Sequence, residues 1–551
     1  MRNIVNRLSS LPQVNIKRSK FDMTPHHHLT TLNAGELIPI YVLECLPGAT
    51  YKLQTRDLVR MSTPIHPVMD DCYLDTYFFF VPNRLVWDNW EEFMGENKTS
   101  YWTKDMPSYT VPQLTFPIRG AEKGSIADYM GIPTDVTGIS VNALPFRAYR
   151  LIWNEWFRDE NVFAPVFINT SKNDNQYGSM AAGPFATSSF GAHPLPVCKF
   201  HDYFTTSLPS PQRGPDVMLP LGDFAPVATS QVYTDNRAYG DGPVLFRPIT
   251  GESAFANFEM LNINVGGYLG SNPDDSIQTA DTTLVVPSNL IADLSQATAA
   301  TINELRMAFA LQSFYEASAR YGGRYTELLR GHFGVVSPDA RLQRPEYIGG
   351  KRVKINMQQV LQTSATNEVS PQGNTAAFSL TADSDKSFTY SSVEHGYIIG
   401  LCCVRTKQTY QYGIERFWSR KDMTDFYFPE FAHIGEQPVY NKEIFAAGTD
   451  ADDEVFGYQE AWADYRQKFS RVSGAYRSNY AQTLDSWHYA EKYSSAPTLS
   501  AAFMEQGYSE IDRTLAVSSS VEDQFLCDFC FELTAVLPMP MYSIPGFGMR
   551  F

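Results

Sequence analysis

The sequence predicts a mainly β protein: an antiparallel sandwich with several helices, long loops between strands and one large surface insertion. Aromatic residues make up 14% of the 551 residues, and they favour strands and large buried surfaces. The 34 Pro and 35 Gly are spread along the chain, which suits a β protein with many loops. Strand patterns occur near both ends of the chain, so terminal strands are expected to pair across a long intervening sequence.

The first strands are predicted before residue 83. The segment ELIPIYVLEC (residues 36–45) precedes a turn at Pro47 and Gly48, and residues 49–61 follow it. The segment CYLDTYFFFVP (residues 72–82) is an almost continuous apolar run, which predicts a strand buried on both faces.

Two segments change to helical spacing. In residues 83–95, Trp87 and Trp90 share one helical face, and Gly95 is expected to end the helix. Residues 145–160 also place apolar side chains on one face. These side chains are Tyr149, Ile152, Trp153 and Trp156.

Residues 215–300 differ in composition from the rest of the chain. They hold ten Asp and Glu against Arg237 and Arg247, which gives −10 + 2 = −8, half of the chain's net charge of −16. Turn-forming residues are dense and no long apolar period continues through the segment. We therefore expect a surface insertion that loops out of the core.

Regular structure is predicted to resume at Thr301. The sequence TINE (residues 301–304) is a capping box, and helical spacing follows it. Long strands are predicted at residues 395–410 and 524–538. In the second strand, one face is apolar and the other polar, as in a half-buried strand. The apolar face carries Phe525, Cys527, Phe529, Phe531 and Leu533.

The net charge excludes a general nucleic-acid-binding surface, because phosphate binding needs an excess of Lys and Arg. Any contact with DNA must therefore come from a local basic patch. The N-terminal residues 1–21 form such a patch, with no acidic residue before Asp22. Its basic residues are Arg2, Arg7, Lys17, Arg18 and Lys20.

The seven cysteines are few and scattered, which favours free thiols in a reducing compartment. The start of the chain lacks the apolar region of a signal peptide. No apolar run approaches the length of a membrane span. We expect synthesis and assembly in cytosol and no membrane partner.

No metal site or cofactor is expected. His26, His27 and His28 are adjacent, so on an extended chain they point in alternate directions and converge poorly on one ion. A loop or an interface patch is the favoured interpretation. Cys527 and Cys530 diverge on a strand and lack a second ligand pair. The acidic run at residues 450–454 lacks the Gly and Glu of a calcium loop.

No nucleotide-binding or nucleophile motif is present, so an enzyme is not expected. The alternative is a carbohydrate-active β enzyme or lectin, since sandwiches also carry those functions. A glycosidase needs two facing carboxylates roughly 5–9.5 Å apart and usually a secretory signal. The absence of that signal disfavours this alternative.

Nine segments, in order, resemble the major coat protein of gokushoviruses, which are microviruses with circular single-stranded DNA. The first are MDDCYLDTYFFFVPNRLVWDNWEEFMGEN (69–97), HDYFTTSLPSPQRG (201–214), RYTELLRGHFGVVSPDARLQRPEYIGG (324–350), SPQGNTAAF (370–378) and EHGYIIGL (394–401). The others are DFYFPEFAHIGEQPVYNKEI (425–444), VFGYQEAWADYR (455–466), LDSWHYA (484–490) and PMPMYSIPG (538–546).

This resemblance implies an eight-stranded antiparallel jelly roll and a T=1 icosahedral capsid of sixty copies that encloses the DNA genome. It divides the chain into a basic arm (1–21), two parts of the coat domain (22–214 and 301–551) and the insertion (215–300). The insertion is expected to form a protrusion at each three-fold axis. The implied partners are further copies, the genome, a small basic DNA-binding protein and a bacterial surface receptor.

Several residues receive roles from this interpretation. The basic arm is expected to face the DNA or to thread over a neighbouring subunit. In the protrusion, apolar residues are expected to pack between copies and acidic residues to lie in solvent, for host attachment or simply as a cap. These residues are Val244, Leu245, Phe246, Leu284, Val285 and Val286, and Asp235, Asp241, Asp274 and Asp275. Large apolar area for the core or for subunit contacts is expected from Trp87, Trp90, Trp153 and Trp156.

Overall fold

The protein is described here by a computed structural model. It describes residues 16–97, 109–117, 119–218, 302–364, 366 and 371–542, and short strands between residues 227 and 292. The chain forms two compact units. The main unit consists of Met1–Pro211 and Ser318–Phe551, and the inserted unit consists of Gln212–Ala317.

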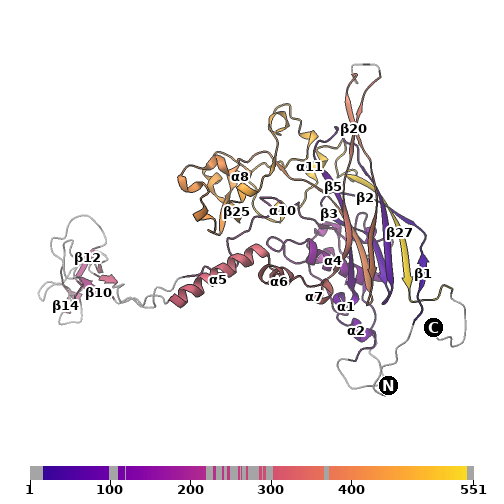
Figure 1. Cartoon of the computed structure of the whole chain (residues 1–551), viewed down its shortest axis with the longest axis horizontal. Helices are drawn as coiled ribbons and strands as arrows, with labels where there is room; N and C mark the ends of the chain where they lie inside the picture. The colour runs from indigo at the N-terminus through magenta and orange to yellow at the C-terminus, as the bar shows by residue number, and fades with distance from the viewer. Residues whose placement is uncertain are drawn as a thin grey trace, which may run out of the picture. The chain divides into compact units, whose positions relative to one another are not determined.

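The main unit contains two antiparallel sheets, whose long strands lie together in Figure 1. The first sheet has the order β1-β27-β4-β21, and β2 pairs with the same edge of β27 as β1. Its strands are β1 (Ser19–Asp22), β2 (His26–Leu32), β4 (Thr50–Met61), β21 (Thr381–Ser391) and β27 (Phe525–Leu537).

The second sheet has the order β18-β5-β22-β3-β9. Its strands are β3 (Glu36–Cys45), β5 (Cys72–Pro82), β9 (Leu195–Pro196), β18 (Glu346–Lys354) and β22 (Gly396–Thr406). In the centre of the sheet, Phe80 lies opposite Ile398 on one side and Glu346 on the other. The strands predicted at 36–45, 72–82, 395–410 and 524–538 are confirmed, with end shifts of a few residues.

The first core lies between the two sheets. Alternate residues of β27 are buried, because a strand presents every second side chain to the same face. They pack with residues of the second sheet such as Leu74, Phe78 and Ile398. The apolar face predicted for residues 524–538 is therefore confirmed. Its members in this core are Phe525, Cys527, Phe529, Phe531 and Leu533.

The second core covers the other face of the second sheet. Phe79 and Val81 of β5 and Ile399 of β22 pack there with helix α4 (Leu144–Ile152), which Figure 1 shows beside β3 and β5. The second sheet therefore lies between two apolar layers. This arrangement explains why the aromatic run of β5 has almost no polar face, as the sequence predicted.

The two predicted helices are shorter than expected. Residues 83–95 form α1 (Asn83–Val86) and α2 (Trp90–Phe93) instead of one helix, because Trp87 is extended and its ring is fully buried. Helix α4 ends at Ile152 and continues as a π-helical turn over Trp153–Phe157. Gly95, with a φ of 103°, follows α2, as predicted.

The rest of the main unit consists of short elements. The hairpin of β19 (Met357–Leu361) and β20 (Thr375–Ser379) projects beyond the sheets in Figure 1. The other strands are β6 (Gln113–Thr115), β7 (Ser140–Asn142), β8 (Asn175–Gln176), β23 (Thr409–Tyr410), β24 (Glu436–Tyr440), β25 (Val455–Glu460) and β26 (Ser470–Arg471). The other helices are α3 (Ile126–Tyr129), α6 (Tyr325–Phe333), α7 (Asp339–Leu342), α8 (Asn441–Ile444), α9 (Ala463–Arg466), α10 (Ala501–Met504) and α11 (Ser509–Asp512).

The described part of the inserted unit contains short antiparallel strands. They are β10 (Val227–Ser230), β11 (Tyr239–Gly240), β12 (Leu245–Pro248), β13 (Glu259–Met260), β14 (Asn262–Ile263), β15 (Leu269–Gly270), β16 (Val285–Pro287) and β17 (Leu290–Ala292). A helix, α5, extends over Ile302–Tyr321, where helical spacing was predicted. Thr301 of the predicted capping box lies outside the described residues.

Truncating β27 in the first core should destabilise the subunit. Leu533 is 3% exposed, so Leu533→Ala removes buried methyl groups and leaves a cavity, at a cost of about 2–5 kcal/mol. Leu29→Ala is the matched control, because Leu29 is 77% exposed and its loss should change stability by about 0.5 kcal/mol or less. Urea unfolding of the unassembled subunit measures both. Equal effects of the two substitutions would contradict the placement of β27.

Candidate functional site

The face of the first sheet that points away from the cores is uncovered within the described residues. The outward positions of β4 include exposed Lys52, Arg56 and Arg60. Arg56 reaches Glu532 of β27 at 2.6 Å, and both residues line a hollow of about 630 Å³. This face carries both signs of charge beside three exposed leucines, Leu29, Leu58 and Leu526. Its charged groups suit a hydrated, charged partner.

The described part of the basic arm lies at the edge of this sheet. Arg18 lies against the turn at Gly48, where a Cβ would come within 3.0 Å of its guanidinium. Lys20 is already part of β1, and its Nζ lies 3.0 Å from Asp22. Hydrogen bonds from Lys20 and from Thr534 lower the pKa of the Asp22 carboxyl. Thus Lys20 lies in the sheet, Lys17 and Arg18 precede it and are exposed, and Arg2 and Arg7 lie outside the described residues.

The four tryptophans belong to the second core or its margin. Trp87 and Trp153 are buried, and Trp90 and Trp156 are half-buried against the same core. The Trp153 indole donates to the carbonyl of Pro196 at 2.8 Å. The Trp156 indole donates to the carbonyl of Pro345, with the Arg344 guanidinium 4.3 Å from its ring centroid. In the subunit, these side chains therefore stabilise the core.

The three histidines lie on strand β2, so the expectation of a loop was wrong. Pairing with β27 extends the segment, and the side chains alternate as a strand requires. His26 packs against the Tyr41 ring, His27 pairs with Asp528 at 3.0 Å, and the Nδ1 of His28 hydrogen-bonds the carbonyl of Ile40. Within the residues that the structure describes, no three metal-ligating side chains converge.

All seven cysteines are unpaired, and six of them are buried. Burial raises the pKa of the Cys45 thiol, and likewise that of Cys403, to about 12. The reactive thiolate is therefore scarce in these two residues at neutral pH. Cys527 is buried, whereas Cys530 is on the opposite, partly exposed side of β27. The prediction that these two sulfurs diverge is confirmed.

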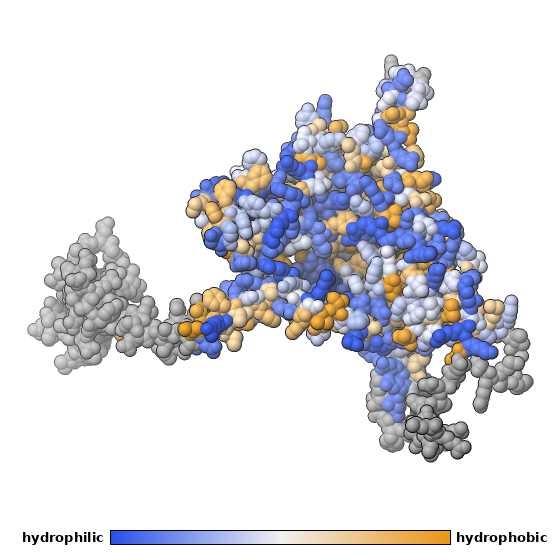
Figure 2. Space-filling view, in the orientation of Figure 1, coloured by the Kyte–Doolittle hydropathy of each residue, from blue (hydrophilic) through white to orange (hydrophobic). Residues whose placement is uncertain are grey.

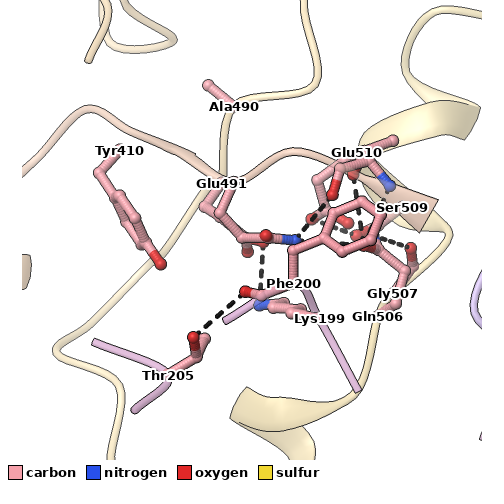
Figure 3. A network of polar contacts seen from close by, with 12 residues as sticks. Lys199, Phe200, Thr205, Tyr410, Ala490, Glu491, Gln506, Gly507, Ser509 and Glu510 are labelled. Carbon is pink, nitrogen blue, oxygen red and sulfur yellow. Dashed lines mark hydrogen bonds and ion pairs between the residues drawn. The ribbon is translucent and has the colours of Figure 1, made fainter. Parts of the chain in front are cut away.

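A buried ion pair, which the sequence did not indicate, joins two distant loops of the main unit (Figure 3). The Nζ of Lys199 lies 2.9 Å from Glu491, and their side chains are 5% and 6% exposed. The ammonium also lies 4.9 Å from the centroid of the Phe503 ring. Burial raises the pKa of Glu491, and the charge of Lys199 opposes this shift. Only a view of the folded chain could reveal this pair, since the two residues belong to no motif.

The pair lines a cavity of about 650 Å³ with several other carboxylates. Glu510 lies there and accepts a hydrogen bond from Ser509 at 2.7 Å. Glu36, at the start of β3, also lines the cavity. Burial, and then the charge of Asp523, raise the pKa of Glu36 to about 7. The cavity thus holds more acidic than basic groups.

Comparison with known proteins now decides the family. A family model described as "Capsid protein (F protein)" matches residues 9–547. The chain belongs to this family of phage capsid proteins. It is 41% identical over 547 residues to the capsid protein VP1 of Bdellovibrio phage phiMH2K, covering 98% of each chain. It is 39% identical over 584 residues to VP1 of Chlamydia phage 1, covering 98% of this chain and 97% of that one.

VP1 of Spiroplasma virus 4 is 42% identical to this chain over 539 residues, covering 96% of this chain and 95% of that one. The coat-protein resemblance in the sequence is therefore confirmed. The capsid protein is a structural, non-enzymatic component of the virion, which removes the carbohydrate-active enzyme as an alternative. None of the helices described here is long and apolar enough to cross a membrane.

Glu36 should give the capsid subunit a defined dependence on pH. The unfolded side chain ionises near its ordinary pKa of 4.5, whereas the folded one keeps its proton up to about pH 7. Stability should therefore fall as pH rises between these values and stay lower above them. Glu36→Gln removes the charge, so the variant should exceed the wild type by up to about 3 kcal/mol near pH 8.

Near pH 4 the two proteins should have the same stability, because Glu36 is then protonated in both the folded and unfolded states. Urea unfolding of the subunit at the two pH values measures the difference. An equal gain at both values would show that Gln acts through packing and not through the charge.

Proposed function

We propose that this capsid protein folds as an eight-stranded jelly roll and assembles as sixty copies into a T=1 icosahedral shell around a circular single-stranded DNA genome. The observation that carries the proposal is the order of the long strands in the two sheets, together with the family. In chain order, the eight strands are β2, β3, β4, β5, β18, β21, β22 and β27.

Numbered in this way, the first sheet has the strand order 1-8-3-6 and the second the order 5-4-7-2. Successive strands alternate between the sheets except for the fourth and fifth, β5 and β18, which pair within the second sheet, and the first and last strands are neighbours. Two sheets formed from interleaved Greek keys in this manner characterise jelly rolls, which are common in viral capsids. The short strands β1 and β9 extend the edges and do not alter this order.

The uncovered face of the first sheet is our candidate for the genome side of the shell. It carries Lys52, Arg56 and Arg60, and the basic arm ends at its edge. The net charge of −16 per copy still repels DNA overall. A small basic DNA-binding protein is therefore a required partner, and the coat supplies local contacts only.

Neutralising the end of the basic arm tests the genome contact. We expect the wild-type chain, produced with its phage partners, to form isometric particles that contain DNA. A triple variant, Lys17→Gln with Arg18→Gln and Lys20→Gln, should form particles that hold less DNA, because three phosphate-binding charges are lost from each copy. Electron microscopy and the ratio of nucleic acid to protein in purified particles measure the two outcomes.

The matched control is Lys123→Gln, which removes a cation 80% exposed outside the arm and should leave the DNA content unchanged. Wild-type protein that stays as soluble monomers would contradict the capsid assembly itself. Normal DNA content in the triple variant would show that the arm contacts a neighbouring subunit instead.

We also propose that residues 215–300 form the three-fold protrusion and attach the particle to a bacterial surface receptor. Two observations support this proposal: the acidic composition of the segment and its membership of a separate compact unit, Gln212–Ala317. Unpaired carboxylates are costly to bury, so such a segment suits an outer surface. Leu245 and Phe246 belong to β12, and Val285 and Val286 to β16. The other proposed residues of the protrusion lie outside the described residues: Asp235, Asp241, Val244, Asp274, Asp275 and Leu284.

Replacing residues 215–300 by a short Gly-Ser bridge tests this role. If the segment attaches the particle, the shortened protein should still assemble, and adsorption to host cells should fall by about tenfold or more. Gradient sedimentation measures assembly, and the loss of particles from the supernatant of host cells measures adsorption. Normal adsorption would place attachment elsewhere, and failure to assemble would make the segment a structural cap of the three-fold contact.

A further inference from the structure

Large apolar side chains are exposed in a segment of the main unit that follows strand β22 of the second sheet. Trp418 is 70% exposed and Met423 is 75% exposed. Figure 2 shows apolar surface over the part of the unit that carries α8 and β25 in Figure 1. We call this the aromatic surface. Its residues are Phe417, Trp418, Met423, Phe426, Tyr427 and Tyr465.

The rings of the aromatic surface contact one another. Phe417 and Trp418 pack with their centroids 4.7 Å apart. Tyr427 lies 6.2 Å from Tyr465, and the Arg420 guanidinium lies 4.4 Å from the centroid of Tyr465 and 5.8 Å from that of Phe426. The rings therefore form two groups within one exposed stretch of chain and α9, Phe417 with Trp418, and Tyr427 with Tyr465 and the Arg420 guanidinium.

Ion pairs and hydrogen bonds hold the backbone of this patch in place. Arg420 pairs with Asp464, and both side chains are mostly buried. Arg416 donates to the carbonyl of Pro438 at 2.7 Å, and the indole of Trp462 donates to that of Phe431 at 2.8 Å. These contacts fix the segment to neighbouring elements. The segment contains three short 3₁₀ turns, which are Arg416–Ser419, Met423–Asp425 and Pro429–Phe431. A surface that is already ordered loses little entropy when it binds.

The exposed area is large for a soluble protein. With 150–250 Å² for each aromatic side chain, the patch exposes on the order of 600–700 Å². Monomeric proteins rarely expose contiguous apolar patches above a few hundred Å², whereas one side of a stable protein interface buries about 800 Å². The aromatic surface can therefore supply most of one such side.

We propose that the aromatic surface is a contact site for a second copy of this chain in the shell. This inference rests on the proposed capsid assembly, in which every copy meets neighbours on several sides. Aromatic residues and Met are enriched in the centres of interfaces and charged groups are depleted there. Arg416 and Arg420 beside the patch are paired with carboxylates of the same chain. The same segment also exposes charged residues, namely Lys421, Asp422, Asp425 and Glu430, so the contact has a polar part as well as an apolar one. A closed shell repeats the contact in every copy.

The double variant Trp418→Ser with Met423→Ser tests the contact. Both side chains are mostly exposed, so the subunit should fold normally, and we expect the yield of particles to fall by about tenfold or more. The matched control is Val393→Ser with Val521→Ser, which removes two apolar side chains that are 79% and 80% exposed outside the patch. This control should assemble as the wild type does. Gradient sedimentation measures particle yield, and thermal unfolding of the subunit checks folding.

Hydrogen exchange of the wild-type protein provides a second measurement that needs no substitution. Amides of residues 414–431 should exchange more slowly in particles than in unassembled subunits. Unchanged exchange there, or an unchanged yield from the double variant, would overturn the inference. An equal loss in the control would do the same, because the effect would not be specific to the patch. Failure of the wild type to form particles would instead overturn the proposed assembly.

Discussion

The pairing of the C-terminal strand β27 holds the main unit together. This strand pairs with β4 along one edge and with β1 and β2 along the other, so the two ends of the chain lie in one sheet. The hydrogen bond from Thr534 to Asp22 joins residues 512 positions apart. Such pairing requires closure of a loop that contains almost the whole chain. Burial of the apolar face of β27 offsets the entropic cost of this loop closure, since every second residue of the strand packs in the first core.

The second sheet carries a different constraint, because it must be apolar on both faces. Its inner face forms the first core with the first sheet, and its outer face forms the second core with α4 and the surrounding loops. Gly400 shows how tight the packing is: a Cβ there would come within 2.7 Å of the Phe78 ring. The segment around α8 and β25 is subject to the same constraint, because Ile444 and Phe456 are buried in the second core.

The sequence predicted the parts of the fold that local patterns determine. The strand at residues 36–45 has the same bounds in the structure, and β27 differs by one residue at each end. The prediction of one helix over residues 83–95 failed, because burial of the Trp87 ring outweighed helical spacing. Adjacent side chains on an extended chain point in alternate directions, and this correctly predicted that the three histidines diverge. Their local sequence did not predict a strand, because β2 forms by pairing with the distant strand β27.

Side-chain pairs between distant loops could not be predicted in the same way. Lys199 and Glu491 share no motif, and each is ordinary in its local sequence. The exposure of the aromatic residues after residue 414 could not be predicted from the sequence either, since a large aromatic side chain is more often buried in a core. Only the folded structure shows that other residues form the two cores and that these aromatic side chains lie on the surface.

The polarity of the two uncovered regions constrains what each can contact. The outer face of the first sheet presents Lys52, Arg56 and Arg60 beside carboxylates such as Glu532, and a charged face of this kind binds hydrated partners without complete loss of water. The aromatic surface presents Trp418 and Met423, which gain free energy when water is removed from them. The two regions therefore cannot exchange roles. In a shell, the apolar region is suited to a dry contact between subunits, and the charged face to a wet contact with nucleic acid.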